Sequence, residues 1–309
     1  MKKIWFDGKL IPGDEAKVSV LAHTLHYGIG VFEGIRSYAN DSGEGAVFRL
    51  DDHLARLEAS AQTCSLPSPF TRDEMARACL DVIDANDLVD AYLRPLLWQD
   101  DGDLAGLGAN PTVHVAVSAH SWGAYLGDEG LTQGIRVTLS EYRRSSEASA
   151  LSRSKICGLY ATNVLAKRES LAQGFDEALL MDDAGFVAEG SGENLFLLKG
   201  SQLVTPPASA GILPGITRDT VLHLAKAIEG VDDIREESIT PDRLLDADEV
   251  FLTGTAAEIT PVREVDHQQI GQGQAGPVTL SLQKAFFDLV RGPITSPSNW
   301  QTPLHRDAS

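Results

Sequence analysis

The 309-residue chain is acidic, with 26 Lys and Arg against 44 Asp and Glu and a formal net charge of −18. This charge repels nucleic acid and anionic membrane surfaces, so we expect neither as a partner. Three cysteines without CxxC spacing favour a reducing, cytoplasmic compartment and disfavour a zinc or other metal site. No apolar run is as long as a membrane span, and the first residues contain too short an apolar stretch for a signal peptide.

Strand and helix patterns alternate in the first third of the chain. Short apolar runs on both sides of Asp7 and Gly8 predict a hairpin. Apolar residues at helical spacing predict a helix over 50–65, which carries two aspartates in its first turn, and a second helix over 72–86. The runs AYLRPLLW and TVHVAVSAH predict strands, the second by strict alternation. We therefore expect this part to be α+β.

Two Gly-rich stretches follow, WQDDGDLAGLGAN and WGAYLGDEGLTQG, and either can be a domain boundary or an active-site loop. After them we predict a strand over 134–142, a helix over 158–172, four short strands within 177–206, a helix over 216–230, a strand over 247–254 and a helix over 279–292. The predicted domains are a small α+β domain at 1–126, an interdomain loop at 127–135 and a large domain at 136–292. The tail at 293–309 is expected to be poorly ordered or ordered by a partner.

Lys155 is the lysine whose surroundings least resemble a surface position, because an apolar run follows it directly. A nucleophilic lysine needs roughly 4 to 5 kcal/mol of differential stabilisation to lose its proton at neutral pH. The start of the following helix supplies only about 0.3 to 2 kcal/mol through its dipole. Burial, or a Schiff base with an aldehyde cofactor, would supply the rest. From the local sequence, a surface lysine and a nucleophilic lysine both stay open.

Several segments are candidates for binding an anion. The helix start at Ile216 and Thr217 and the small residues at 253–257 both offer backbone amides, although each can equally be an ordinary cap or turn. An anion held by an acidic protein also needs a fixed cation. Arg56 is a candidate for it, and the alternative is an arginine on a solvated helix face.

Glu189 and Glu193 flank a Gly-Ser-Gly turn between two predicted strands. Both can be ordinary turn residues. Alternatively, one of them faces a buried cationic nitrogen such as that of a pyridinium ring, where an ion pair would keep both groups charged.

Six segments occur in an order and at a spacing that resemble a known family: LHYGIGVFEGIRSY, AYLRPLLW, WGAYLG, EGSGENLF, LPGITRD and ADEVFLTGTAAEITPVREVD. They are similar to the class IV aminotransferases of pyridoxal-phosphate fold type IV, and most similar to the branched-chain amino-acid aminotransferases. The resemblance covers nearly the whole chain. It implies a two-domain α+β and α/β fold, like that of D-amino-acid aminotransferase, with pyridoxal 5'-phosphate (PLP) at the domain interface and a large PLP-binding domain.

The resemblance also implies an activity and a set of site residues. The chain would move the amino group between L-leucine, L-isoleucine or L-valine and 2-oxoglutarate by a ping-pong mechanism. Lys155 would form the Schiff base and act as the acid/base catalyst, Tyr160 would bind the phenolic oxygen of PLP, and Glu189 its pyridine nitrogen. The phosphate would be bound by Arg56, Ile216, Thr217 and Thr255. The substrate pocket would be lined by Phe32, Gly34, Arg36, Tyr92, Arg94, Trp122, Tyr125, Ala256 and Ala257, with Tyr27 reaching in from the neighbouring subunit of at least a homodimer.

Such a pocket suits two kinds of substrate. Burying a branched aliphatic side chain against aromatic walls contributes about 1.5 to 3 kcal/mol of binding free energy. Arg94 can donate hydrogen bonds to the distal carboxylate of glutamate. Three alternatives keep the same cofactor: a D-amino-acid aminotransferase, an (R)-selective amine transaminase and an aminodeoxychorismate lyase. The branched-chain activity is favoured over these three by two segments, VFEGIRSY and GTAAEITPV. A non-catalytic phosphate- or cofactor-binding protein is a further alternative, but it would not need both Lys155 and Glu189.

Overall fold

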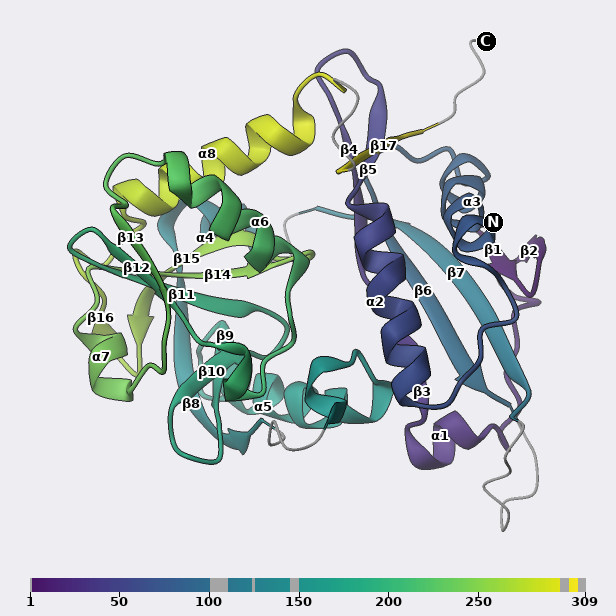
Figure 1. The fold of residues 1–309 in the computed structure, drawn as a ribbon, viewed down its shortest axis with the longest axis horizontal. Helices are drawn as coiled ribbons and strands as arrows, with labels where there is room; N and C mark the ends of the chain where they lie inside the picture. Colours follow the sequence, from purple (N-terminus) through teal and green to yellow (C-terminus); the bar gives the residue numbers. More distant parts are fainter. Residues whose placement is uncertain (1, 101–110, 124–125, 145–149, 295–299, 305–309) are drawn as a thin grey trace. The chain divides into compact units, whose positions relative to one another are not determined.

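The computed structural model describes residues 2–100, 111–123, 126–144, 150–294 and 300–304. The chain forms two compact units (Figure 1). The first unit contains residues 1–122, 154–159 and 290–309, and the second contains 123–153 and 160–289. The polypeptide thus returns to the first unit twice, once for the short segment that carries Lys155 and once for its C-terminal residues. The domain limits expected from the sequence stay a prediction.

The first unit is built on a sheet. Its described strands are β1 (Lys3–Phe6), β2 (Lys9–Pro12), β3 (Gly30–Phe32), β4 (Ile35–Ala39), β5 (Gly45–Phe48), β6 (Ala91–Gln99), β7 (Val113–Ser121) and β17 (Gln301–Pro303). They lie in the order β17-β5-β4-β6-β7-β1-β2, and β3 pairs with β6. The predicted β1–β2 hairpin is confirmed. Asp7 and Gly8 at its turn have φ values of 45° and 89°, the left-handed conformation that a tight hairpin turn requires.

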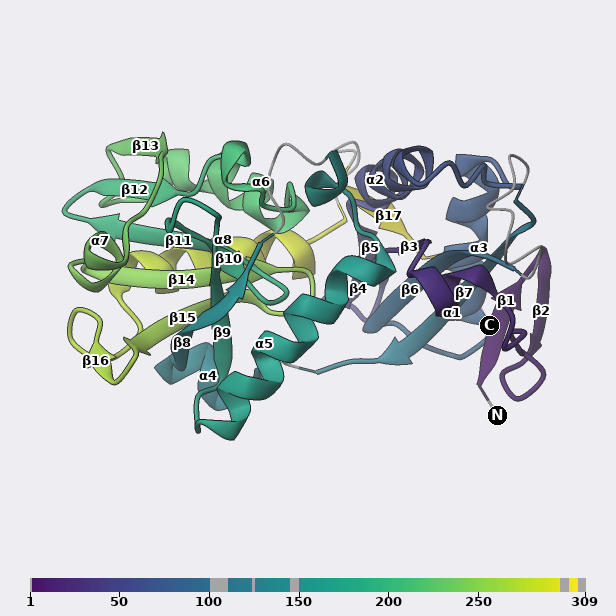
Figure 2. The ribbon, with the colours of Figure 1, turned by 90° about the horizontal axis from the view of Figure 1, so that it is seen from below.

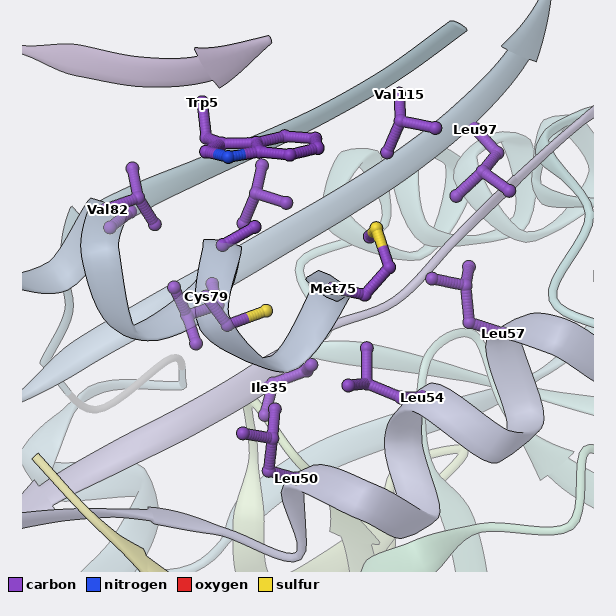
Figure 3. Packing of buried hydrophobic residues seen from close by; sticks show 14 of the residues in the cluster. Trp5, Ile35, Leu50, Leu54, Leu57, Met75, Cys79, Val82, Leu97 and Val115 are labelled. Carbon is purple, nitrogen blue, oxygen red and sulfur yellow. The ribbon is translucent and has the colours of Figure 1, made fainter. Parts of the chain in front are cut away.

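Helices α1 (His23–Tyr27), α2 (Leu50–Thr63) and α3 (Arg72–Asp84) complete the first unit. Thr71 and Glu74 form a capping box that starts α3. The apolar faces of α2 and α3 are directed toward the sheet, where Leu54 and Cys79 are buried with Trp5 and other residues in one cluster (Figure 3). The core of this unit therefore lies between the two predicted helices and one face of the sheet.

The C-terminal residues contain a strand that the sequence does not predict. In the described part of this segment, β17 pairs antiparallel with β5, and the guanidinium of Arg49 lies 4.7 Å from the ring centroid of Trp300. The expectation that the tail is poorly ordered or depends on a partner is wrong for residues 300–304, because this chain's own sheet edge supplies their hydrogen bonds.

The second unit is built on another sheet. Its described strands are β8 (Ile135–Arg143), β9 (Glu177–Met181), β10 (Val187–Gly190), β11 (Asn194–Lys199), β12 (Gln202–Thr205), β13 (Asp233–Glu236), β14 (Glu249–Gly254), β15 (Glu258–Val265) and β16 (Gln268–Gln269). Their order is β10-β9-β8-β15-β14-β11-β12-β13, with β16 paired to β15. Because β10 also pairs with β11, six of these strands close into a ring. The four strands expected within 177–206 are confirmed as β9 to β12.

The helices of the second unit are α4 (Gly127–Gln133), α5 (Tyr160–Ala172), α6 (Ile216–Leu224), α7 (Pro241–Leu245) and most of α8 (Pro277–Arg291). Helix α5 packs against β8 and β9 (Figure 2). Helix α6 packs against β14. The segment expected to be an interdomain loop, residues 127–135, contains α4, so a loop is the wrong prediction for residues 127–133. None of the helices in the described ranges has the length and apolar character needed to cross a bilayer.

Candidate active site

An aromatic surface around Arg94 lies in the first unit. Tyr92 and Arg94 are two residues apart on β6, so their side chains point to the same face of the sheet. The guanidinium of Arg94 lies 4.8 Å from the ring centroid of Phe32 and donates a hydrogen bond of 2.9 Å to the hydroxyl of Tyr92. The indole of Trp122 stacks on the ring of Tyr92 with 4.7 Å between centroids. The structure thus brings together four residues that the sequence assigns to substrate binding.

Gly34 lies against this surface and makes it possible. A Cβ atom at Gly34 would lie 2.0 Å from the hydroxyl oxygen of Tyr92, so any side chain here would displace the group that contacts Arg94. Arg36 pairs with Tyr92 across β4 and β6, is buried, and places its guanidinium 4.9 Å from the ring centroid of Tyr38. Glycine at position 34 is therefore required by the packing of Tyr92.

Lys155 lies in the segment that returns to the first unit. Its amide donates to the hydroxyl of Ser60 (3.0 Å), and its carbonyl accepts from the amide of Phe32 (3.1 Å). Its Nζ lies 5.0 Å from the ring centroid of Phe32. The backbone of Lys155 is thus fixed between α2 and β3, with its amine beside the aromatic surface.

Arg56 is a fixed cation. Its side chain on α2 is 12% exposed, so it is not on a solvated helix face. Its Nε and Nη2 donate to the two carboxylate oxygens of Glu33 at 2.7 and 2.9 Å, and His53 also contacts this carboxylate. Burial opposes ionisation of Glu33, but Arg56 and His53 outweigh burial and hold the pKa of this carboxyl well below its usual range.

In the second unit, Glu189 is buried at the end of β10. One carboxylate oxygen lies 2.8 Å from Nε of Arg144. The other accepts from the side-chain amide of Asn194 (3.0 Å) and from the backbone amide of Leu213 (3.1 Å). Donors to both oxygens, one of them a guanidinium, hold this carboxylate ionised and in one orientation.

A set of donors suited to an anion lies beside Asn194 in the same unit. Helix α6 begins at Ile216 without a side-chain cap, and Thr217 in its first turn is buried. A Cβ atom on Gly215 would lie 1.9 Å from Oδ1 of Asn194, so the backbone at the helix start requires glycine. In the described part of the chain, the buried hydroxyl of Thr253 makes no hydrogen bond. An uncapped helix start and a buried hydroxyl are the groups that a phosphate uses.

Thr255, Ala256 and Ala257 form the turn that joins β14 to β15, next to Thr253. Because α6 packs against β14, both anion-binding segments expected from the sequence belong to one part of the second unit. Tyr160 begins α5, and this helix is tied by Asn163 to the carbonyl of Ser191 between β10 and β11.

Two further tyrosines belong to the site expected from the sequence. Tyr27 ends α1 at the surface of the first unit and is 47% exposed, with its ring beside those of His23 and His26. Tyr125 and residues 101–110 lie outside the described residues.

Four residues hold the expected site residues in place but are not among those expected from the sequence: Glu33, His53, Arg144 and Asn194. Glu33 and Asn194 lie within the six segments that resemble the family, but nothing in those segments indicates which side chains they contact. Arg144 sits in the polar run EYRRSSEAS, which looks like an exposed segment. No local pattern distinguishes it from a surface arginine.

Glu193, the second carboxylate flanking the Gly-Ser-Gly turn, differs from Glu189. Burial and the neighbouring charge of Glu177 raise the pKa of Glu193 to about 8, although Lys167 acts in the opposite direction. One carboxyl oxygen accepts from the amide of Gly192 at 3.0 Å. At neutral pH, therefore, Glu189 is the charged member of the pair and Glu193 is mostly protonated.

We expect Glu193→Gln to stabilise the protein at pH 8 by about 4 kcal/mol. An unfolded glutamate ionises near pH 4.5, whereas Glu193 in the folded state ionises near pH 8. Between these values the folded state retains a proton that the unfolded state has lost, so wild-type stability falls as pH rises. Urea unfolding at pH 4.5 and pH 8 measures this. The two proteins should match at the lower pH and separate at the higher, and parallel pH profiles would show that the carboxyl is ionised.

Known proteins resemble this chain over nearly its whole length. Residues 30–265, more than half of the chain, match the family described as amino-transferase class IV. The branched-chain-amino-acid aminotransferase of Pseudomonas aeruginosa is 45% identical over 97% of this chain and 96% of its own. The crystal structure of the Escherichia coli branched-chain amino acid aminotransferase has a TM-score of 0.91 and 42% identity, covering 98% of this chain and 99% of the other.

The T.th. branched-chain amino acid aminotransferase with pyridoxamine 5'-phosphate has a TM-score of 0.91 and 41% identity, with coverage of 98% and 99%. Structures of that protein complexed with 4-methylvaleric acid and with N-(5'-phosphopyridoxyl)-L-glutamate have TM-scores of 0.89 and 0.88 at 39% identity, again with coverage of 98% and 99%. These similarities extend over nearly the full length of each chain. The two-sheet architecture is that of fold type IV, and this chain belongs to the class IV aminotransferases.

Proposed function

We propose that this chain is a PLP-dependent transaminase that moves the amino group between branched-chain L-amino acids and 2-oxoglutarate. The observation that carries the proposal is the amine of Lys155 beside the aromatic surface that contains Arg94. The names of the relatives and the ligands of the T.th. structures support the same substrates and cofactor.

The residues present fit PLP. Glu189 is an ionised buried carboxylate suited to a pyridinium nitrogen, and the uncapped start of α6 with the hydroxyl of Thr253 suits a phosphate. When bound, PLP withdraws electrons from the α-carbon of the amino acid and so makes its proton acidic. The residues proposed to hold the cofactor are Arg56, Lys155, Tyr160, Glu189, Ile216, Thr217 and Thr255.

Lys155 is the proposed acid/base group. Its Nζ would accept the proton from the α-carbon of the amino acid and donate it to the cofactor carbon that receives the amino group. In the second half-reaction it would move a proton in the opposite direction, to the α-carbon of the 2-oxo acid. Hydrogen bonds fix the backbone of Lys155 to Ser60 and Phe32, so the amine moves only by rotation of its own side chain. This pre-organisation reduces the ordering that the reaction requires.

The aromatic surface would serve both substrates. The rings of Phe32, Tyr92 and Trp122 would cover the side chain of leucine, isoleucine or valine, which gains about 1.5 to 3 kcal/mol on burial. Arg94 and the hydroxyl of Tyr92 would bind the distal carboxylate of glutamate or 2-oxoglutarate. Gly34, Arg36, Tyr125, Ala256 and Ala257 would complete the contacts.

We expect Gly34→Ala to raise KM for 2-oxoglutarate about tenfold, the cost of losing one hydrogen bond to a charged group. The new methyl group would displace the hydroxyl of Tyr92 and break its bond to Arg94. Tyr92→Phe removes the same hydroxyl without adding bulk and should have a similar effect. A methyl group at position 34 would also lie 2.7 Å from the ring carbon that carries the hydroxyl, so in steady-state assays the double variant should be no worse than Gly34→Ala alone. An additive loss would contradict this account.

We also propose that the protein is a homo-oligomer, at least a dimer, in which Tyr27 enters the pocket of the neighbouring subunit. Apolar side chains are exposed on and just before α1, at Val18, Val20, Leu21 and Leu25. A cluster of this kind on one segment is typical of a surface that a partner covers. Light scattering of the purified protein tests this, and a monomeric mass would contradict it.

The free cysteines Cys64, Cys79 and Cys157 support a cytoplasmic location. The activity is tested by steady-state assays with 2-oxoglutarate and L-leucine, L-isoleucine, L-valine, D-alanine or (R)-1-phenylethylamine as amino donor. We expect turnover with the three branched-chain L-amino acids. Turnover with D-alanine or the amine alone would favour a D-amino-acid aminotransferase or an (R)-selective amine transaminase. Turnover with no donor would leave a lyase or a non-catalytic binding protein.

A further inference from the structure

We propose that Glu33 is a positioning residue that directs the guanidinium of Arg56 toward the phosphate of the cofactor. The inference rests on the proposed function, in which Arg56 binds that phosphate. Both residues belong to the first unit, Glu33 between β3 and β4 and Arg56 on α2.

Glu33 holds Arg56 by two bonds at once. Nε of Arg56 donates to Oε1 at 2.7 Å, and Nη2 donates to Oε2 at 2.9 Å. Two parallel bonds fix the plane of a guanidinium, whereas one bond lets it turn. An arginine that is already ordered loses less side-chain entropy when an anion binds. This pair of hydrogen bonds, which we call the Glu33–Arg56 fork, therefore strengthens phosphate binding.

The carboxylate of Glu33 is itself held in place. It is fully buried, and Oε2 also accepts from Nδ1 of His53 (2.8 Å) and from the backbone amide of Gly34 (3.2 Å). His53 lies three residues before Arg56 on α2, so both face the carboxylate from the same side of the helix. Burial lowers the pKa of His53, although the hydrogen bond to Glu33 and its charge act in the opposite direction, and the charges of Arg56 and Lys155 add to the effect of burial. Glu33 is thus an anchor that links Arg56 to the backbone beside the aromatic surface.

A second effect of Glu33 would act in the opposite direction. A negative charge near an anion site weakens anion binding by simple repulsion. Removing the charge would therefore strengthen PLP binding if repulsion dominated, and would weaken it if positioning dominated. The fork geometry favours positioning, and the sign of the change separates the two effects.

The test compares the affinity of the apo-protein for PLP with its affinity for pyridoxal, which lacks the phosphate, by absorbance titration. Glu33→Gln removes the charge, and Glu33→Asp keeps it but retracts it by one methylene group. We expect both variants to lose affinity for PLP by about tenfold or more while their affinity for pyridoxal changes little. A variant that is merely less well folded would lose affinity for both compounds, and thermal unfolding of each apo-variant checks this directly.

Arg56→Met provides the control. In that background Glu33→Gln should cause no further change in the preference for PLP, because the group it positions is absent. Tighter PLP binding by Glu33→Gln, or an unchanged preference in both Glu33 variants, would overturn the inference and leave the proposed function standing. A wild-type protein that binds neither compound would overturn the proposed function, and the inference with it.

Discussion

Replacing Lys155 by alanine is expected to lower kcat by about 10³-fold or more, the contribution typical of a positioned acid/base group. The variant should also lose the absorbance band of the lysine-bound cofactor. The physical reason is that Nζ of Lys155 beside Phe32 is the amine that the proposed mechanism uses for both proton transfer and covalent attachment. Steady-state assays and absorbance spectra measure the two effects.

Lys284→Ala is the matched control for this prediction. Lys284 is exposed on α8 and pairs with Asp288 one turn later, so its loss should leave both kcat and the spectrum unchanged. An unchanged absorbance band in Lys155→Ala, with circular dichroism like that of the wild type, would refute the assignment of the lysine.

The second large effect is expected at Arg144. Arg144→Met should destabilise the apo-protein by about 3 to 5 kcal/mol, because it leaves the buried carboxylate of Glu189 without its cationic partner. It also removes the donor to the carbonyls of Gly211 and Ser152. Urea unfolding followed by circular dichroism measures the change, and hydrogen exchange should show the loss of protection in β10 and β11.

Arg235→Met is the control for the ion pair. Arg235 pairs with Asp233 at 2.8 Å as Arg144 pairs with Glu189, but Arg235 is exposed, so its loss should cost less than about 1 kcal/mol. An equal loss of unfolding free energy in the two variants would mean that burial does not increase the contribution of the Arg144–Glu189 pair to stability.

The elements that could be predicted from the sequence have local causes. Helix α3 was predictable from apolar residues at helical spacing, and the β1–β2 hairpin from the Asp7-Gly8 turn. Strand β17 was not, because its polar, Pro-rich segment has no strand pattern and becomes a strand only by pairing with β5. Helix α4 was missed because its Gly-rich sequence has low helix propensity.

In the site, too, some residues could be predicted from local sequence, whereas others depend on contacts made only in the fold. Motif residues such as Phe32 and Arg94 could be chosen from the sequence, and they lie together in the structure. The fork between Glu33 and Arg56 joins residues 23 positions apart, and nothing in the local sequence indicates that either charge is buried. The different ionisation of Glu189 and Glu193 likewise depends on Arg144 and Glu177, which are brought close only by folding. Motifs therefore identify candidate groups, while the fold determines their charge and orientation.

The most direct test of the proposed function is the absorbance spectrum of the purified PLP-bound protein, recorded before and after adding L-leucine, D-alanine or (R)-1-phenylethylamine in separate samples. We expect L-leucine alone to convert the band of the lysine-bound cofactor to that of the pyridoxamine form, and 2-oxoglutarate to restore it. Conversion by D-alanine or the amine but not by L-leucine would contradict the branched-chain assignment, and a spectrum without a cofactor band would contradict the PLP chemistry itself.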